Sequence, residues 1–283
     1  MTASGGAPAA EPFFLKTAGG TRFCLFHAPI GACLGAVLYV SPFAEEMNRS
    51  RRMAALQARE LAKLGYGVLQ LDLHGCGDSS GDFMDARWDT WKHDLALGAA
   101  WLHERLGQPL ILWGSRLGVL LALDYARTAP HPVASMLLWQ PILSAHAYLT
   151  QFLRLRVAGA LLGEDGAGQQ GTNALRATLQ TGQAVEVAGY RLAPALAASI
   201  DALPPLYSMP PSCPVHWFEA IAAAGQEPSP RVLQAAASWR NAGVDLHFQA
   251  VICPPFWSTS EITISPAWLE ATSAALRMGR HDD

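Results

Sequence analysis

Short apolar runs alternate along this chain with longer segments whose apolar residues recur at helical spacing. The runs are rich in β-branched and aromatic residues, which is typical of strands buried on both faces. The predicted strands are Ala36–Val40, Tyr66–Leu73, Leu110–Trp113, Ala134–Trp139, Pro214–Glu219 and Val244–Val251. The predicted helices are Arg49–Leu64, Trp88–Leu106, a segment ending near Thr128, Arg231–Asn241 and Pro266–Met278. This alternation predicts an α/β fold with a mostly parallel sheet, helices on both faces and a ligand site at the carboxyl ends of the strands.

Between residues 142 and 209 the alternation of predicted strands and helices is interrupted. The segment has helical stretches at Ala145–Leu162, Thr172–Thr181 and Leu192–Asp201. Because it is inserted between two predicted strands, we expect either a cap over the sheet or an extra helical layer without a gating role. The predicted organisation is a core of residues 13–141 and 210–283, a helical cap insertion at 142–209 and a disordered tail at 1–12.

The stretch Pro109–Leu121 combines a buried strand, a glycine-flanked turn and an immediate helix. Gly114 and Gly118 lie four residues apart, and the residue between them is expected to have a strained backbone that leaves no room for nearby side chains. This layout is that of the G-x-S-x-G nucleophile elbow of α/β-hydrolases. Its central position is occupied by Arg116, and the nearby hydroxyl, Ser115, falls one residue early.

Three motifs carry a family resemblance: SPFAEEMNRSRR at Ser41–Arg52, DLHGCGDSSG at Asp72–Gly81 and WGSRLG at Trp113–Gly118. Together they resemble the α/β-hydrolase superfamily over nearly the whole chain. More narrowly, the first motif and the serine-less elbow resemble the second family of exosortase A system-associated hydrolases. The resemblance implies an α/β-hydrolase fold and an ester or thioester (acyl) hydrolase from bacterial gene neighbourhoods of exosortase, PEP-CTERM sorting and exopolysaccharide synthesis.

The positions of a serine-hydrolase triad carry unusual residues. A guanidinium stays protonated, so Arg116 cannot attack a carbonyl. Glu219 and Glu227 lie near the expected acid position, outside the usual Gly-x-x-Asp setting. Where relatives carry the catalytic histidine, this chain reads CPPFW at Cys253–Trp257. The sequence therefore predicts a degenerate triad, with Ser115 pointing into the packing between sheet and helix.

An arginine beside a helix N-terminus favours an anion or an acidic partner. Glu45 and Glu46 lie in the loop that normally supplies an oxyanion donor, and either is expected to pair with Arg116. Such a pair is purely structural, or its carboxylate orients water as a general base. The predicted catalytic candidates are accordingly Arg116, Glu46, Glu45 and Ser115. Predicted to contact the ligand are Phe43, Asn48, His74, Leu117 and Trp257.

Composition narrows the remaining function classes. The 283 residues carry a net charge of −3 without a basic run, which argues against a nucleic-acid partner. The apolar runs are too short for direct membrane insertion. Five scattered cysteines without C-x-x-C spacing favour the reducing cytoplasm, and no histidines have metal-ligand spacing.

We therefore expect no metal and no cofactor, and a small acyl or anionic ligand. Two hypotheses stay open at this point. The protein is a divergent hydrolase, or a non-catalytic relative that binds an anionic or acyl ligand or a protein partner. The sequence does not fix the oligomeric state.

Overall fold

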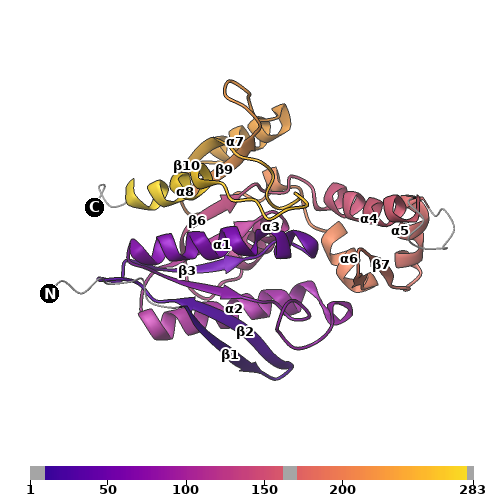
Figure 1. The fold of residues 1–283 in the computed structure, drawn as a ribbon, viewed down its shortest axis with the longest axis horizontal. Coiled ribbons are helices and arrows are strands. Elements are labelled where there is room, and N and C mark those ends of the chain that lie inside the picture. The colour runs from indigo at the N-terminus through magenta and orange to yellow at the C-terminus, as the bar shows by residue number, and fades with distance from the viewer. Residues whose placement is uncertain (1–9, 162–170, 279–283) are drawn as a thin grey trace.

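The computed structural model describes residues 10–161 and 171–278. Its centre is a sheet of β1 (Glu11–Thr17), β2 (Gly20–His27), β3 (Gly35–Val40), β4 (Tyr66–Leu71), β5 (Leu110–Ser115), β6 (Val133–Trp139), β9 (Val215–Ile221) and β10 (Leu246–Ile252). The strand order is β1-β2-β4-β3-β5-β6-β9-β10 (Figure 1). Neighbouring strands from β4 to β10 are parallel, whereas β1 and β2 are antiparallel and form one edge. The predicted α/β class, with a mostly parallel sheet, is confirmed.

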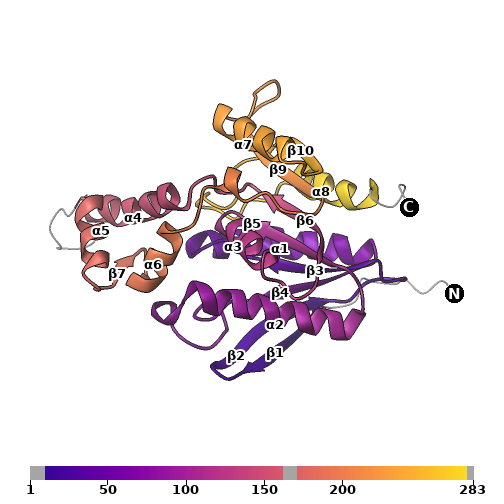
Figure 2. The same ribbon diagram turned by 180° about the vertical axis from the view of Figure 1, so that it is seen from behind.

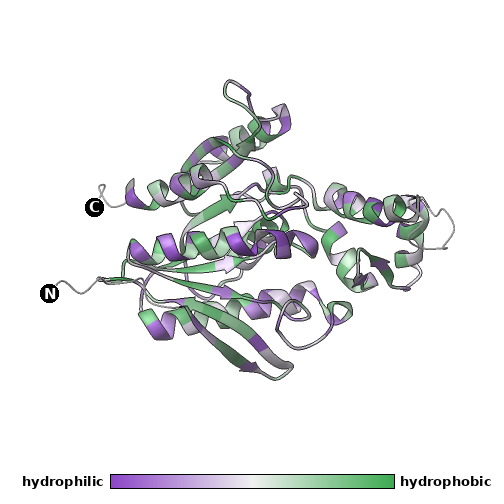
Figure 3. Ribbon diagram, viewed as in Figure 1, coloured by the Kyte–Doolittle hydropathy of each residue, from purple (hydrophilic) through white to green (hydrophobic). Residues whose placement is uncertain are grey.

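Helices cover both faces of the sheet, as the two opposite views show (Figures 1 and 2). One face packs against α1 (Glu45–Lys63) and α8 (Pro266–Met278). The other packs against α2 (Trp88–Leu106), α3 (Leu117–Ala126) and α7 (Pro230–Asn241). In β3 all residues are buried, with Leu38 in one apolar layer and Val37 and Tyr39 in the other. The hydropathy colouring shows the same arrangement, apolar strands at the centre and polar residues on the outer helix faces (Figure 3).

The described part of residues 142–209 contains α4 (Ala145–Leu161), α5 (Thr172–Gln180), β7 (Val185–Val187), β8 (Tyr190–Leu192), α6 (Pro194–Asp201) and the 3₁₀ turn η2 (Leu206–Ser208). The elements from α4 to α6 lie together at one end of the molecule (Figure 1), whereas η2 packs beside α7. The β7–β8 hairpin departs from the all-helical expectation for this segment. Its two turn residues, Ala188 and Gly189, both have positive φ, 48° and 82°, the combination of a type I′ hairpin turn. Three-residue strands give too short an alternation to be detected in the sequence.

Several element boundaries differ from those predicted. The tail predicted at 1–12 lies mostly outside the described residues, and its last two residues, Glu11 and Pro12, instead begin β1, which pairs with β2. Helix α1 begins at Glu45 and not at Arg49, so both glutamates form its first turn. Acidic side chains are favourable there because the helix dipole is positive at this end. Within the described ranges, none of the helices combines the length and the apolar character that a membrane span requires.

Candidate functional site

The turn between β5 and α3 has the geometry that its glycines predict. Arg116 caps α3 with φ 55° and ψ −123°, a sparsely populated conformation for a residue with a side chain. A Cβ atom on Gly118 would lie 2.4 Å from the carbonyl oxygen of Ser41, and one on Gly114 would lie 2.8 Å from the Cα of Val119. Glycine is thus required at both flanking positions, and the elbow register inferred from the sequence is the one that forms.

The Arg116 side chain pairs with Glu46. Its Nη2 lies 3.0 Å from Glu46 Oε1, and its Nε lies 3.3 and 3.2 Å from the two carboxylate oxygens. The hydroxyl of Tyr148, from α4, donates to Glu46 Oε2 at 3.0 Å. Both carboxylate oxygens are therefore engaged, and the pair is largely buried, with side-chain exposures of 14% for Arg116 and 18% for Glu46.

Glu45 takes no part in this contact, so the alternative Glu45–Arg116 pair does not form. Its carboxylate pairs with Arg49, with Oε1 3.4 Å from Nε, and accepts hydrogen bonds from the Tyr190 hydroxyl at 3.3 Å and the Asn48 amide at 3.2 Å. Asn48 also donates to the Tyr190 hydroxyl at 2.9 Å. Burial, followed by the negative charge of Glu45, raises the pKa of Tyr190 to about 12. Glu45 and Asn48 thus tether the β7–β8 hairpin to α1, outside the Arg116 contact.

Ser115 is fully buried at the end of β5. Its Oγ has no solvent-accessible surface to offer to a ligand, so the structure does not support Ser115 as a catalytic candidate. The reason is the alternation of side chains along a strand. Ser115 and Arg116 leave the turn in different directions, and only the second reaches the carboxyl edge of the sheet.

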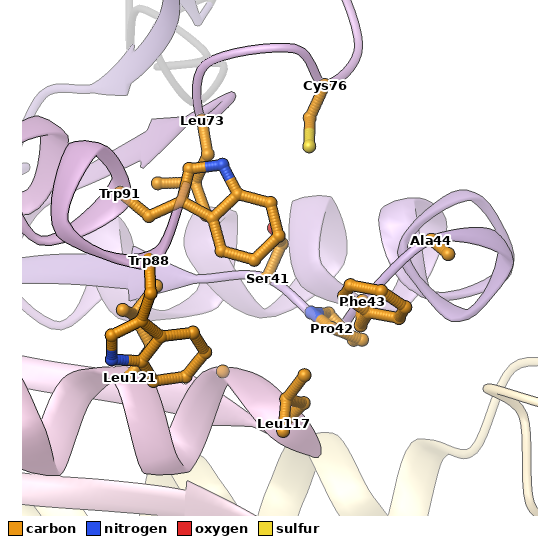
Figure 4. A pocket seen from close by; sticks show the side chains of 11 residues that line it. Ser41, Pro42, Phe43, Ala44, Leu73, Cys76, Trp88, Trp91, Leu117 and Leu121 are labelled. Carbon is orange, nitrogen blue, oxygen red and sulfur yellow. The ribbon is translucent and has the colours of Figure 1, made fainter. Parts of the chain in front are cut away.

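Phe43 and Leu117 line a different pocket from Arg116, shown in Figure 4. In that view the rings of Trp88 and Trp91 and the thiol of Cys76 complete an apolar lining around the loop that follows β3. The free volume of this pocket is only about 10 Å³. A void of this size holds about one water molecule at most, and the side chains around it are packing partners.

His74 lies in the loop after β4 and is not among the residues that line the cavity beside Arg116. Its backbone N–H donates to Asp94 Oδ2 at 2.8 Å, and its carbonyl accepts from Trp91 Nε1 at 2.9 Å. A Cβ on Gly81 would lie 2.5 Å from the His74 ring, so the ring is packed directly on this loop. These contacts hold His74 within its loop, and its predicted contact with a ligand stays a prediction.

Trp257, by contrast, does reach the site. The guanidinium carbon of Arg116 lies 5.0 Å from the centre of the Trp257 ring and 5.9 Å from that of Tyr148. These are cation–π distances. Phe256 is fully buried beside Trp257, at a ring separation of 5.0 Å. Trp257 therefore contacts the Arg116 guanidinium through its ring face, and Phe256 packs against Trp257.

A cavity of about 830 Å³ opens beside Arg116, between α4, η2, α7 and the ends of β6 and β9. Gln140 and Glu219 lie on its floor, with Gln140 Nε2 donating to Glu219 Oε1 at 2.7 Å. The indole of Trp217 donates to Glu219 Oε2 at 3.0 Å. Burial raises the pKa of Glu219, while these two hydrogen bonds and the Arg116 charge oppose the shift.

Sequence reasoning missed several residues around this cavity, notably Gln140, Tyr148 and Arg231. Gln140 carried a usable signal, since it directly follows a buried strand and thus lies at the carboxyl edge where ligands bind. Its backbone has a φ of 45°, and its carbonyl oxygen lies 3.5 Å from Arg116 Nη1. Tyr148 and Arg231 had no such signal, because each comes from a helix distant in sequence. Within the described ranges, no three histidine, cysteine, aspartate or glutamate side chains lie close enough to hold a metal ion.

Residues 34–196 match the family model described as serine aminopeptidase, S33. The chain belongs to this family of α/β-hydrolases. Membership agrees with the strand–turn–helix of the elbow and with the order of the sheet. No curated protein matches the chain.

Solved structures of the same fold are similar over nearly the full length. A soluble variant of monoglyceride lipase from Saccharomyces cerevisiae, in complex with a substrate analog, has a TM-score of 0.63 at 15% identity, covering 96% of this chain and 94% of the lipase. Est1E from Butyrivibrio proteoclasticus with bound ferulic acid has a TM-score of 0.60 at 12% identity, with coverages of 95% and 97%. An α/β serine hydrolase without lid from Xanthomonas campestris has a TM-score of 0.54 at 15% identity, with coverages of 96% and 93%. At these identities the likeness shows the shared fold alone.

Proposed function

We propose that this member of the family binds an anionic ligand in the cavity beside Arg116 and does not use a serine nucleophile. The observation that carries the proposal is the position of the guanidinium, which stands at the centre of the elbow and lines the cavity. An arginine has five N–H groups. Its acceptors among the described residues, Glu46 and the Gln140 carbonyl, engage three of them. Two N–H groups stay available for a ligand oxygen.

The charges around the cavity support an anion as the ligand. Arg231, in the first turn of α7, also lines the cavity and forms no salt bridge with any described carboxylate. The carboxyl group on the floor, Glu219, has its pKa raised by burial, which favours its neutral form. Glu46 is neutralised by Arg116 itself. The charges of Arg116 and Glu46 cancel, so the positive charge on the lining that has no salt-bridge partner among the described residues is that of Arg231, and Arg116 adds its remaining N–H groups to it.

Three features support binding over nucleophilic catalysis. Arg116 cannot attack a carbonyl, and the adjacent Ser115 is buried. Glu46 accepts hydrogen bonds from Arg116 and Tyr148 through both oxygens, so its carboxylate is held by these two side chains. A general base must first be within reach of the proton it accepts. We therefore include in the proposal that the catalytic triad is degenerate.

Isothermal titration calorimetry with hexanoate and with inorganic phosphate tests the binding function. Wild-type protein is expected to bind at least one of these anions, and Arg116→Gln is expected to weaken binding tenfold or more. The matched control is Arg240→Gln, at the far end of α7, which leaves the cavity intact. Equal affinity in wild type and Arg116→Gln would overturn the proposal.

A second candidate function is a divergent ester or thioester hydrolase, with the exosortase and exopolysaccharide context that the resemblance implies. Family membership and the buried Glu219 carboxyl beside Arg116 favour it. Hydrolysis of p-nitrophenyl esters and acyl thioesters by wild type and by Ser115→Ala, with loss in Glu219→Gln, would support this second function. Loss in Ser115→Ala alone would restore a serine mechanism and would contradict the binding proposal.

A further inference from the structure

The cavity beside Arg116 has a mixed lining, in which neutral polar side chains lie among apolar ones. Gln151 of α4 and Gln234 of α7 are exposed, and neither amide makes a hydrogen bond to any group in the described part of the chain. Tyr207 of η2 adds a ring that is 55% exposed. Amides offer both donors and acceptors, and an exposed ring offers a flat apolar surface.

Two serines at helix starts add further hydrogen-bonding capacity. Ser229 caps α7, and its Oγ accepts the N–H of Val232 at 3.4 Å. Ser144, just before α4, accepts the N–H of Ala147 at 3.2 Å in the same way. In both cases the hydroxyl serves as an acceptor for the helix, so its own proton is still available to donate. Both residues line the cavity.

An acyl chain would meet a lining in this site that is interrupted by polar groups. The apolar side chains of the large cavity include Ile142, Leu143 and Val232 as well as the shorter Ala147 and Ala235. The mostly apolar pocket around the loop that follows β3, drawn in Figure 4, is too small for an acyl chain, since its free volume is about 10 Å³. Sites for apolar ligands are lined predominantly by hydrophobic and aromatic groups, with only a few polar ones. The lining here carries more polar groups than that expectation allows, among them three glutamines and three serines.

We infer that the ligand is a polyhydroxylated anion, such as a sugar acid or a sugar phosphate, rather than a fatty acyl group. Its anionic group would lie against Arg116, with its hydroxyls toward Gln151 and Gln234 and a ring face toward Tyr207. This inference rests on the proposed binding function and specifies its ligand class. A carboxylate and a phosphate share the chemistry that Arg116 recognises, since both offer two oxygens to a guanidinium.

Calorimetric titration of the full chain with D-glucuronate, glucose 6-phosphate, glucose, hexanoate and octanoate tests this inference. At least one sugar anion is expected to bind tenfold or more tightly than hexanoate, octanoate or neutral glucose. The two sugar anions distinguish a carboxylate from a phosphate as the preferred group. Tighter binding of hexanoate or octanoate would overturn the inference and leave the anion-binding function standing. Failure of all the anions to bind would overturn both.

Two variants give an independent readout. Gln151→Ala and Gln234→Ala are each expected to weaken sugar-anion binding about three- to tenfold, the effect of one hydrogen bond, while leaving hexanoate binding unchanged. The matched control is Gln180→Ala, an exposed glutamine at the end of cap helix α5. All three side chains are exposed, so folding is expected to persist, and thermal unfolding checks this. Unchanged sugar-anion binding in both variants would overturn the assignment of the hydroxyl contacts.

Discussion

Removal of the Arg116 guanidinium leaves the Glu46 carboxylate largely buried, with Tyr148 as its remaining donor. A buried charge without its partner is costly, so Arg116→Met is expected to lower the free energy of unfolding by about 1–3 kcal/mol. Urea denaturation measures the change. The neighbouring pair Arg49–Glu45, with side-chain exposures of 32% and 41%, provides the control, because Arg49→Met should cost less than about 1 kcal/mol. Equal losses in the two variants would contradict the distinction between these pairs.

Glu219 gives a pH-dependent prediction. Burial raises its pKa in the folded protein, so between the unfolded and folded pKa values the native state holds more protons than the unfolded state. Stability contributed by neutral Glu219 is therefore present at low pH and is lost as pH rises from about 4.5 through the folded pKa. Glu219→Gln mimics the neutral form, so this variant should gain stability relative to wild type over that window.

Denaturation at several pH values measures this difference, and Glu104→Gln, an exposed carboxyl on α2, is the matched control. If the stability gained by Glu219→Gln over wild type shrinks as pH rises, the pKa of Glu219 is not raised in the folded protein. In that case Glu219 would add negative charge to the cavity, and the anion-binding proposal would weaken with it.

Among the elements, the contact between α3 and the end of β3 is sensitive to side-chain volume. A Cβ on Gly118 would lie 2.4 and 2.5 Å from the carbonyl oxygens of Ser41 and Val40, which are backbone atoms that cannot rotate away. Gly118→Ala is therefore expected to destabilise the protein by about 1–3 kcal/mol or more. Gly171→Ala is the control, since a Cβ there meets nothing within 4 Å and its φ is −63°. Similar thermal unfolding temperatures for the two variants would contradict the close helix–strand approach.

In the molecule as a whole, the segment between β6 and β9 is joined to the sheet layer by hydrogen bonds from its tyrosines to adjacent glutamates of α1. Tyr190 contacts Glu45, and Tyr148 contacts Glu46. Tyr190→Phe removes the first contact, and we expect amide hydrogen exchange in the β7–β8 hairpin to become about three- to tenfold faster, as loss of one net hydrogen bond implies. Tyr207→Phe, whose ring is exposed, is the control. Unchanged exchange in Tyr190→Phe would show that other contacts hold the hairpin.

Much of the fold follows from the sequence, because strand and helix periodicities are local properties. The buried strands are at or near their predicted positions, and α2 has the predicted limits Trp88 and Leu106. The β7–β8 hairpin was missed because its strands are too short for their alternation to stand out. The start of α1 was also missed, since a helix N-terminus is set as much by what its first turn contacts as by its own residues.

The sequence by itself determined the register of the elbow, because two glycines four residues apart are a steric requirement of a tight strand-to-helix turn. That register placed Arg116 at its centre. Only the tertiary structure decided that Glu46, and not Glu45, faces Arg116, because successive residues on a helix point about 100° apart and the start of α1 fixes which one faces inward. It also brought Tyr148, Gln140 and Arg231 to the cavity. Their proximity depends on long-range packing between elements, which no local pattern encodes.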